Sequence, residues 1–366
     1  MSANADPHVP PAPDVAPTGG FAHHRGLDFP FAGRVPAPGE VVAVAPGIGW
    51  LRHPLPIGID HVNAWAIDDE DGALTIVDTG MGSTECRDGW KAALAGPLDG
   101  RRVARVIGTH FHADHVGLAG WLCRRDGAML WMTRGEWLTL RLGTTDARDA
   151  PPDEAVAFWR GAGWSDDQIA AAAARGWGWM ARVVSRLPYG YRRIVDGEVI
   201  AIGGHAWRVV VGSGHSPEHA CLYDSARGIF IAGDQVLPRI SPNVSLGPTE
   251  PDADPLGEWL ASIAKLRREV AGDVLVLPSH GEPFHGLHTR LDALDREHRK
   301  RLDLLHAHLA EPRRAVDCFG RMFRRAIGAD AIGLATGETL AHLRHLEVEG
   351  RAVRTVEDGV WWYRAA

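Results

Sequence analysis

The sequence predicts an α+β sandwich with a helical insert and a separate helical C-terminal region. Two blocks of short apolar, strand-like runs, at about 41–107 and 198–280, flank a tryptophan-rich stretch of different character. Several of these runs end in a histidine or an aspartate beside a glycine or proline. From Leu287 onward the chain becomes helical and charged. Strand-like runs grouped in two blocks, with helices between and after them, are typical of an α+β protein.

The first block contains the runs VVAVA, HVNAWAI and ALTIVDTG between Val41 and Thr79. The pair Asp71-Gly72 is a hairpin signal, because both residue types tolerate the backbone of a tight turn. A helix is expected over residues 85–94, followed by the strand RVARVIGTH. The second block contains EVIAI, HAWRVVVGSGH, GIFIAGD and DVLVLPSH, with a helix expected at 256–270.

Residues 123–191 are expected to form a helical insert. Ser165 and Gln168 fit a capping box, which predicts the start of an alanine-rich helix running towards Leu187. Six of the fourteen tryptophans fall in this stretch. After residue 287 the pattern predicts several helices, broken at Pro312, and a closing β-hairpin.

The composition excludes several classes of protein. The 366 residues are 45% hydrophobic and carry a net charge of −7, which does not favour nucleic acid or an anionic membrane as partner. We expect no membrane span and no signal peptide, and a poorly ordered, proline- and alanine-rich tail over residues 1–40. Four scattered cysteines with no C-x-x-C pair predict reduced thiols in a cytoplasmic protein.

The motif THFHADHVG, residues 109–117, predicts a metal site. His110 and His112 project to one side if the backbone is extended, and Asp114 and His115 follow where the chain turns. Imidazole and carboxylate groups without a thiolate suit Zn²⁺, and also Fe or Mn. Four potential ligands within six residues diverge too much to serve one tetrahedral ion. We therefore expect two ions, with further ligands at other strand ends.

Three later strands deliver such residues. WRVVVGSG is followed by His215, GIFIAG by Asp234, and VLVLPS by His280. Each residue lies beside a glycine or proline that lets the backbone turn, so all three side chains are expected to gather at one edge of the sandwich. A single histidine after a strand is usually structural, but four segments of the same design favour a common site.

With these motifs, the chain resembles the metallo-β-lactamase-fold hydrolase superfamily over about residues 41–283. The resemblance implies a four-layer αββα catalytic domain over 41–286, with the insert at 123–191. The region 287–366 resembles the small winged-helix appendage of a glyoxalase II-like dinuclear branch, although no basic glutathione-binding cluster is recognisable. The acidic third helix of this appendage, in which glutamates outnumber the single arginine, favours packing or a homodimer over nucleic-acid binding.

The resemblance also implies a role for each site residue. His110, His112 and His215 are expected to bind one metal ion. Asp114, His115 and His280 are expected to bind a second ion, with Asp234 bridging the two. Asp78, in VDTG, matches an aspartate that supports the ligands from behind. Asp114 and Asp234 are the expected catalytic carboxylates, and a hydroxide bridging the two ions is the expected nucleophile.

Departures from known branches narrow the function. The expected bridging residue Asp234 is missing from class B β-lactamases, which counts against antibiotic hydrolysis. Leu237 stands where many acyl-homoserine lactonases have tyrosine, so an ester or thioester is favoured over a lactone. Glu218 replaces a familiar glycine in GHSPEH and predicts an altered local backbone. Flavodiiron proteins have glutamate where this chain has His112.

The substrate is expected to be a small molecule with an apolar portion. The tryptophan-rich insert follows the metal motif and is the expected pocket wall, with His61 as a further contact; a purely structural role for these aromatic residues stays open. The candidate contacts are Trp131, Trp177, Trp179, Tyr189, Tyr191 and His61. The alternatives to a dinuclear ester or thioester hydrolase are an endoribonuclease or phosphodiesterase of the same fold, an iron-dependent sulfur dioxygenase, and a non-catalytic binding protein.

Overall fold

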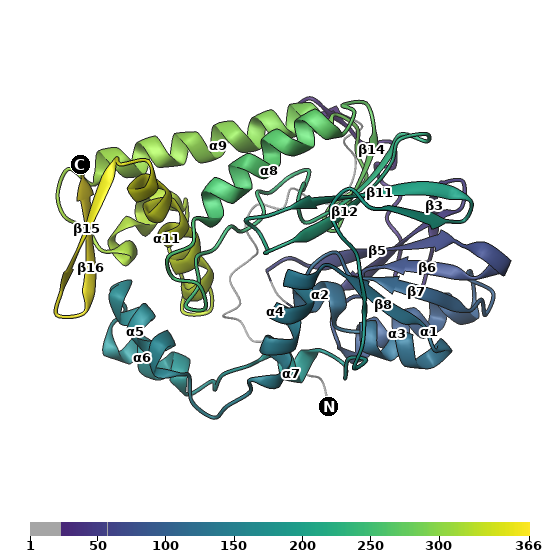
Figure 1. The fold of residues 1–366 in the computed structure, drawn as a ribbon, viewed down its shortest axis with the longest axis horizontal. Coiled ribbons are helices and arrows are strands. Elements are labelled where there is room, and N and C mark those ends of the chain that lie inside the picture. Colours follow the sequence, from purple (N-terminus) through teal and green to yellow (C-terminus); the bar gives the residue numbers. More distant parts are fainter. Residues whose placement is uncertain (1–22, 57) are drawn as a thin grey trace.

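A computed structural model describes residues 23–56 and 58–366, in which two large β-sheets pack face to face (Figure 1). The strands of the first sheet, in order, are β3 (Val42–Ala45), β4 (Ile48–Pro54), β5 (His61–Asp68), β6 (Leu74–Val77), β7 (Val103–Ile107), β8 (Met129–Met132) and β9 (Arg192–Arg193). Those of the second are β10 (Val199–Ile202), β11 (His205–Gly212), β12 (His219–Asp224), β13 (Ile229–Gly233) and β14 (Leu275–Pro278).

The core between the sheets consists mainly of valine and isoleucine side chains and contains three fully buried tryptophans, Trp50, Trp65 and Trp207. Trp50 and Trp65 lie on paired strands and stack with ring centroids 6.3 Å apart. Such cross-strand aromatic pairs stabilise a sheet beyond the area that they bury. The turn before β6 is the short 3₁₀-helix η1 (Glu70–Gly72), in which Asp71 has the positive φ of 55° that the hairpin signal anticipates.

Helices cover both outer faces, so the expected four-layer αββα sandwich is confirmed (Figure 1). Helices α1 (Thr84–Ala95) and α3 (Ala119–Asp126) pack on the first sheet through one hydrophobic core. Helices α8 (Pro255–Glu269) and α9 (Leu287–His308) pack with the second sheet through another. Strands β6, β7 and β8 run parallel, as do β13 and β14, so the carboxyl ends within each set lie at one edge.

The insert is only partly helical. Its helices are α4 (Arg134–Thr145), α5 (Asp153–Gly161), α6 (Asp166–Ala173) and α7 (Met180–Val183). The capping box at Ser165 is present, but α6 ends at Ala173 instead of continuing towards Leu187. The expectation of a wholly helical insert is wrong at β8, because this apolar run MLWM pairs with β7 in the first sheet.

The C-terminal region contains helices followed by a hairpin, in the expected order. After α9 come η2 (Ala315–Cys318), α10 (Phe319–Met322), α11 (Ile332–Val348), β15 (Ala352–Glu357) and β16 (Val360–Ala365). Most of α11 is buried, which leaves little of it available to enter a nucleic-acid groove. The insert reaches this region, since Phe158 of α5 packs edge-on against Trp361 of β16 with ring centroids 5.4 Å apart.

Residues 23–40 contradict the expected tail, whereas residues 1–22 lie outside the described part of the chain. The short strands β1 (His23–His24) and β2 (Leu27–Asp28) form a hairpin. Leu27 and Phe29 are buried, and Asp28 exchanges backbone hydrogen bonds with His285. The four cysteines are free and buried. Among the described residues no helix is long and apolar enough to cross a membrane.

Candidate metal centre

The residues of the predicted site meet at one edge of the sandwich. Strand β7 leads through Thr109 into the histidine motif, and the short helix α2 (Ala113–Val116) turns the chain back after His112. His215 lies in the loop between β11 and β12. Asp234 follows β13 directly, and His280 follows β14 by one residue. Hydrogen bonds from Ala220 N to Thr109 O and from Asn63 N to Ser279 O join the sheets here.

Three histidines form the first group. The Nε2 atom of His110 lies 2.8 Å from Nδ1 of His112 and 3.3 Å from Nε2 of His215. Their rings are tightly grouped, with centroids 4.6 to 5.0 Å apart. Three ring nitrogens facing one another at these distances present lone pairs to one point, as the ligands of a tetrahedral ion do.

Asp114, His115 and His280 form the second group, and Asp234 lies between the two groups. The Oδ2 atom of Asp114 lies 3.3 Å from His115 Nε2 and 3.5 Å from His280 Nε2. Asp234 directs Oδ2 towards His215 Nε2, at 3.4 Å. Its Oδ1 is directed towards His280 Nε2 at 3.4 Å and His115 Nε2 at 3.6 Å. One carboxylate therefore reaches both groups.

Hydrogen bonds behind the histidines fix which nitrogen faces the site. Nδ1 of His215 donates to the carbonyl of Asn243 at 2.7 Å, and Nδ1 of His280 donates to the carbonyl of His61 at 2.6 Å. A carbonyl only accepts, so each Nδ1 carries the proton and each Nε2 keeps its lone pair. Nδ1 of His115 donates to Asp78 Oδ2 at 2.8 Å in the same way.

Asp78 lies at the centre of this supporting network. Its Oδ1 accepts from Thr109 N at 2.9 Å, and its Oδ2 accepts from Thr109 Oγ1 at 2.8 Å. Because the hydroxyl proton of Thr109 is directed to Asp78, its oxygen accepts from Nδ1 of His110 at 3.0 Å. Asp78 has a φ of 60°, a costly conformation for a non-glycine residue that persists where the surroundings hold it.

The electrostatics of the cluster favour a bound cation. Burial, reinforced by the neighbouring histidines, lowers the pKa of His112 to about 3. The pKa of Asp114 and that of Asp234 lie well below the usual range, because the nearby histidines outweigh the opposing effect of burial. Burial alone would lower the pKa of His280. The carboxylates of Asp234 and Asp114 outweigh this effect and raise that pKa to about 10. Buried carboxylates that draw positive charge onto a histidine offer the same sites to a metal ion.

Two buried polar atoms without hydrogen-bond partners also indicate a site for divalent ions. His115 Nε2 and Asp234 Oδ1 are buried and have no hydrogen-bond partner among the described residues. Buried polar atoms without partners are rare, because they cost about 1–3 kcal/mol each. Both atoms belong to overlapping groups of three donors that lie within 4.8 Å of one another. Nitrogen and carboxylate donors in this number suit Zn²⁺ in particular.

Glu136 supports the site although no sequence motif marks it. This buried side chain of α4 accepts from Phe111 N at 2.9 Å and from Glu218 N and Ser216 Oγ at 2.7 Å. It therefore ties the His110–His112 loop to the loop that carries His215. Burial raises the pKa of Glu136 to about 7. A lone glutamate in an insert helix gives no sequence signal for this role.

Glu218 and His219 explain the unusual GHSPEH stretch. The Glu218 carboxylate accepts from Gly135 N at 2.7 Å and so caps α4, the helix that carries Glu136. His219 lies behind the site, and its Nε2 accepts from the backbone N of Asp234 at 3.0 Å. Gly233 leaves room for this ring, because a Cβ atom there would lie 2.3 Å from His219 Cε1.

The predicted substrate contacts have diverse surroundings. His61 lies at the site, where its carbonyl holds His280 and its Nε2 accepts from Gly281 N. Trp131 is flanked by the guanidinium groups of Arg105 and Arg192, at 4.8 and 4.0 Å from its ring centroid.

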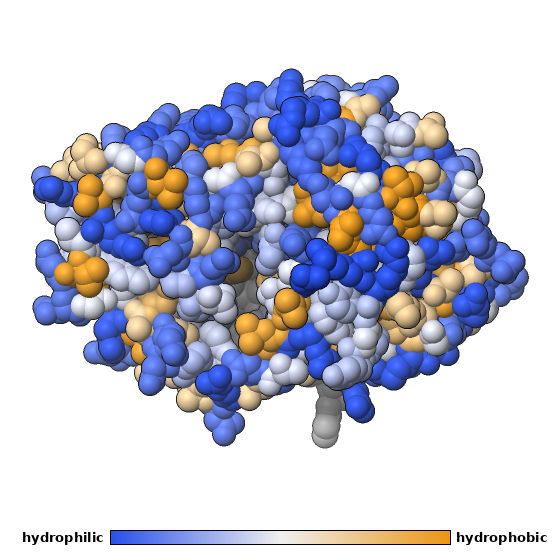
Figure 2. All heavy atoms as spheres, viewed as in Figure 1, coloured by the Kyte–Doolittle hydropathy of each residue, from blue (hydrophilic) through white to orange (hydrophobic). Residues whose placement is uncertain are grey.

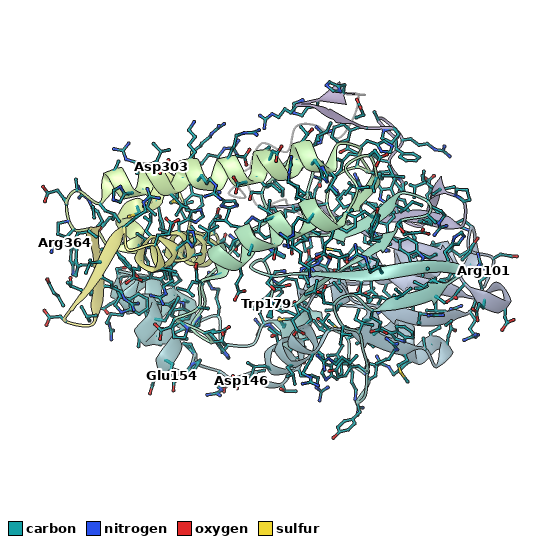
Figure 3. The ribbon with its side chains drawn as sticks, turned by 45° about the horizontal axis from the view of Figure 1, so that its top comes forward. Arg101, Asp146, Glu154, Trp179, Asp303 and Arg364 are labelled. Atoms are coloured by element: carbon teal, nitrogen blue, oxygen red, sulfur yellow. The ribbon has the colours of Figure 1, made fainter. Side chains whose placement is uncertain are left out.

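The remaining aromatic candidates belong to the insert. Tyr191 stacks on Trp137 at 4.6 Å, and Trp177 contacts Trp159 at 6.3 Å. Trp179 is 53% exposed and Tyr189 is 94% exposed. Figure 3 shows Trp179 between the sandwich and the C-terminal helices. Their part in substrate binding stays a prediction.

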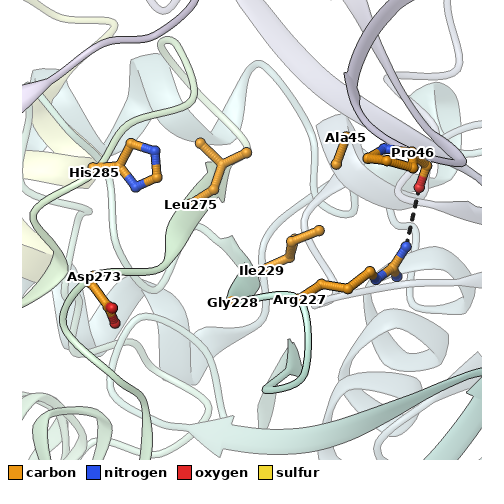
Figure 4. A pocket seen from close by; sticks show the side chains of 8 residues that line it. All are labelled: Ala45, Pro46, Arg227, Gly228, Ile229, Asp273, Leu275 and His285. Atoms are coloured by element: carbon orange, nitrogen blue, oxygen red, sulfur yellow. Dashed lines mark hydrogen bonds between the residues drawn. The ribbon is translucent and has the colours of Figure 1, made fainter.

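The surface near α4 is apolar and hollowed. Figure 2 shows hydrophobic side chains over α4 and α7 beside a hollow at the centre of this face. Leu138 and Leu142, one turn apart on α4, are 58% and 50% exposed. A separate pocket of about 470 Å³ lies elsewhere, where β13 and β14 begin (Figure 4). It is lined in part by Ile229 and Leu275 and by Arg227, whose guanidinium donates to the Pro46 carbonyl.

Comparisons with known proteins agree on one family. The model of the metallo-beta-lactamase superfamily matches residues 57–281, and that of a metallo-beta-lactamase-like C-terminal domain matches 302–366. A solved beta-lactamase domain protein from Burkholderia ambifaria is 40% identical, with a TM-score of 0.82 over 94% of this chain and 100% of that one. A metallo-beta-lactamase family protein from Thermus thermophilus is 26% identical, with a TM-score of 0.75 over 88% and 100%.

Some relatives carry functional names. The probable metallo-hydrolase YqjP of Bacillus subtilis is 24% identical over 82% of this chain and 92% of its own. The acyl-coenzyme A thioesterase MBLAC2 of Gallus gallus is 27% identical over 52% of this chain and 63% of its own.

Proposed function

Because this chain belongs to the metallo-beta-lactamase superfamily and is a metal-dependent hydrolase, we propose that it is a dinuclear enzyme that cleaves an ester or thioester with an apolar portion. The observation that carries the proposal is the position of Asp234, whose two oxygens are directed at separate groups of ligand-type side chains. A mononuclear site has no need of such a carboxylate.

The metal ions of the proposal are two Zn²⁺. His110, His112 and His215 would hold one ion, Asp114, His115 and His280 the other, and Asp234 both. When bound, a pair of divalent ions lowers the pKa of a water molecule so that it attacks at neutral pH, and polarises the substrate carbonyl. Zn²⁺ is proposed over Fe and Mn because five imidazole ring nitrogens face the site.

The chain's own residues orient and exchange protons in this proposal. Asp78 and the two backbone carbonyls hold the imidazole rings, so no reorganisation is needed when substrate arrives. Asp114 is only partly buried by its surroundings, whereas His115 beside it is fully buried. The carboxylate of Asp114 is therefore placed to accept the proton of the attacking water and to return it to the leaving group.

The proposed substrate class is supported by apolar surface on and near α4, the helix that carries Glu136. The exposed leucines Leu138 and Leu142 on α4 and the exposed ring of Trp179 offer apolar surface to a substrate. The thioesterase relative supports a thioester, and Leu237 in place of tyrosine counts against a lactone. The burial of α11 and the net charge of −7 count against the endoribonuclease alternative.

The test is a metal analysis combined with a substrate panel of acyl thioesters, carboxylic esters, lactones and phosphodiesters. Wild type, Asp234→Ala and the exposed control Asp88→Ala are compared under the same conditions. We expect two zinc ions per chain, highest kcat/KM for thioesters or esters with apolar acyl groups, and a loss of at least 100-fold in Asp234→Ala alone. One iron per chain together with oxygen uptake would instead establish the sulfur dioxygenase, and equal hydrolysis by all three proteins would refute the assigned site.

A further inference from the structure

The C-terminal helices reach the metal centre through a short loop. Residues 241–246, between β13 and α8, have no regular secondary structure, so their position depends on the burial of Val244 and Leu246 and on hydrogen-bonded tethers to other elements. Three tethers lead to the C-terminal helices. Ser241 Oγ is hydrogen-bonded to His298 Nε2 of α9 at 3.1 Å, and Leu246 N donates to the carbonyl of Gly337 in α11 at 3.0 Å.

The third tether involves Asn243, the residue whose carbonyl holds His215. Its Nδ2 donates to Glu338 Oε2 of α11 at 3.2 Å, and the other oxygen of Glu338 accepts from Arg301 of α9 at 2.8 Å. Gly337 permits this approach, because a Cβ atom there would lie 2.8 Å from the hydroxyl of Ser245. The Glu338 carboxylate is thus fixed on one side by α9 and fixes Asn243 on the other.

We propose that Glu338 is a positioning residue, which holds Asn243 so that its carbonyl orients His215 towards the first metal ion. The proposal rests on the metal-dependent function above. The carbonyl acceptor at 2.7 Å determines both the tautomer and the ring plane of His215. The side chain of the same residue helps to set the position of this carbonyl. Glu338 accepts from the Nδ2 of that side chain, and the neighbouring Ser245 hydroxyl donates to its Oδ1. The C-terminal region therefore completes the metal centre without contributing a ligand.

Loss of the Glu338 carboxylate is expected to affect the binding of only one of the two metal ions. Glu338 acts on His215, which belongs to the three-histidine group. In the other group, His115 is held by Asp78 and His280 by the carbonyl of His61. Loss of the Glu338 carboxylate should weaken one of two metal-binding steps and leave the other unchanged. A general loss of stability would weaken both steps.

The experiment uses the full chain, freed of metal with a chelator and titrated with Co²⁺ followed by visible absorption. Glu338→Ala and Asn243→Ala, which keeps the backbone carbonyl, are compared with wild type and with the control Thr336→Val. The control removes a hydrogen bond of the same helix, from Trp164 Nε1 at 2.8 Å, that leads away from the loop. Wild type is expected to bind two Co²⁺ ions. In Glu338→Ala and in Asn243→Ala, the affinity of one of the two binding steps should fall about 10- to 100-fold, and the absorption spectrum of that step should change.

The double variant Glu338→Ala/Asn243→Ala should bind no more weakly than the weaker single variant, since both act through one contact. Unchanged affinity and spectrum in Asn243→Ala and Glu338→Ala, or changes equal to those in Thr336→Val, would overturn the proposal while leaving the hydrolase intact. Absence of metal binding by the wild type would instead refute the proposed function itself. If Glu338→Ala does not fold, Asn243→Ala and Glu338→Gln, which leaves one acceptor oxygen, decide the question.

Discussion

Replacing Glu136 tests whether the two ligand loops are held together by one buried carboxylate. In Glu136→Ala, the backbone N–H groups of Phe111 and Glu218 lose their acceptor inside the protein. Each buried donor left unsatisfied costs about 1–3 kcal/mol. The Ser216 hydroxyl can rotate, and removal of a buried carboxylate offsets part of the cost, so we expect a net destabilisation of about 2–4 kcal/mol.

Glu136→Gln provides an intermediate case. Its amide oxygen can replace the oxygen that accepts from both Ser216 and Glu218, while its NH₂ group would face Phe111 N–H. One contact is then lost, at about 1–3 kcal/mol. Because Phe111 separates two ligands, we also expect zinc affinity to fall roughly 10-fold in Glu136→Gln and further in Glu136→Ala.

The assay is urea denaturation of the metal-free proteins together with chelator competition for zinc. The control is Glu154→Gln, an exposed glutamate of α5, which should change neither quantity measurably. The reasoning fails if both Glu136 variants have a free energy of unfolding within about 0.5 kcal/mol of the wild-type value and bind zinc equally well. The two loops would then be positioned by something other than this carboxylate. The limit of about 0.5 kcal/mol is the usual effect of a surface substitution.

Three further predictions concern stability. Chelation of the metal should lower the melting temperature measured by calorimetry, by an amount that zinc restores in a concentration-dependent way, because the ions bind only the folded chain. Gly233→Ala should destabilise the protein by at least about 2 kcal/mol in denaturant titration, because the new Cβ meets the ring of His219 at 2.3 Å; a tolerated alanine would contradict that packing. Burial, with the neighbouring ring as a second cause at His298, lowers the pKa of His298 to about 2, and burial lowers that of His342 to about 3. Below pH 6.5 the unfolded chain therefore binds more protons than the folded chain. The free energy of unfolding should then fall on acidification by roughly 1.4 kcal/mol per pH unit for each of the two histidines. In His298→Gln the free energy of unfolding should depend less steeply on pH.

The sequence predicted the histidine cluster because a simple pattern recurs. His215, Asp234 and His280 each follow an apolar run and a turn residue, and the ends of neighbouring strands meet at one edge. The fold follows from the same runs. In contrast, β8 was hidden because a four-residue apolar run between two helices has no periodicity that distinguishes strand from helix.

Other parts of the site leave no trace in the sequence. The acceptor for His215 is a backbone carbonyl, and any residue at position 243 would supply one. Glu136 acts through tertiary contacts to residues 25 to 82 positions away. The segment 23–40 is ordered despite its proline and glycine content, because Leu27 and Phe29 are buried against distant parts of the chain.

The extent of one hydrophobic core has a consequence for folding. Leu27, Phe158 of the insert, Val276 of the second sheet and Tyr363 of β16 belong to the same buried cluster. The buried members of this cluster are Leu27, Phe29 and residues from Phe158 to Tyr363, so the cluster cannot close until β16 has been synthesised. We expect the insert, the second sheet and the C-terminal region to exchange their amide hydrogens as one cooperative unit, rather than as separable modules.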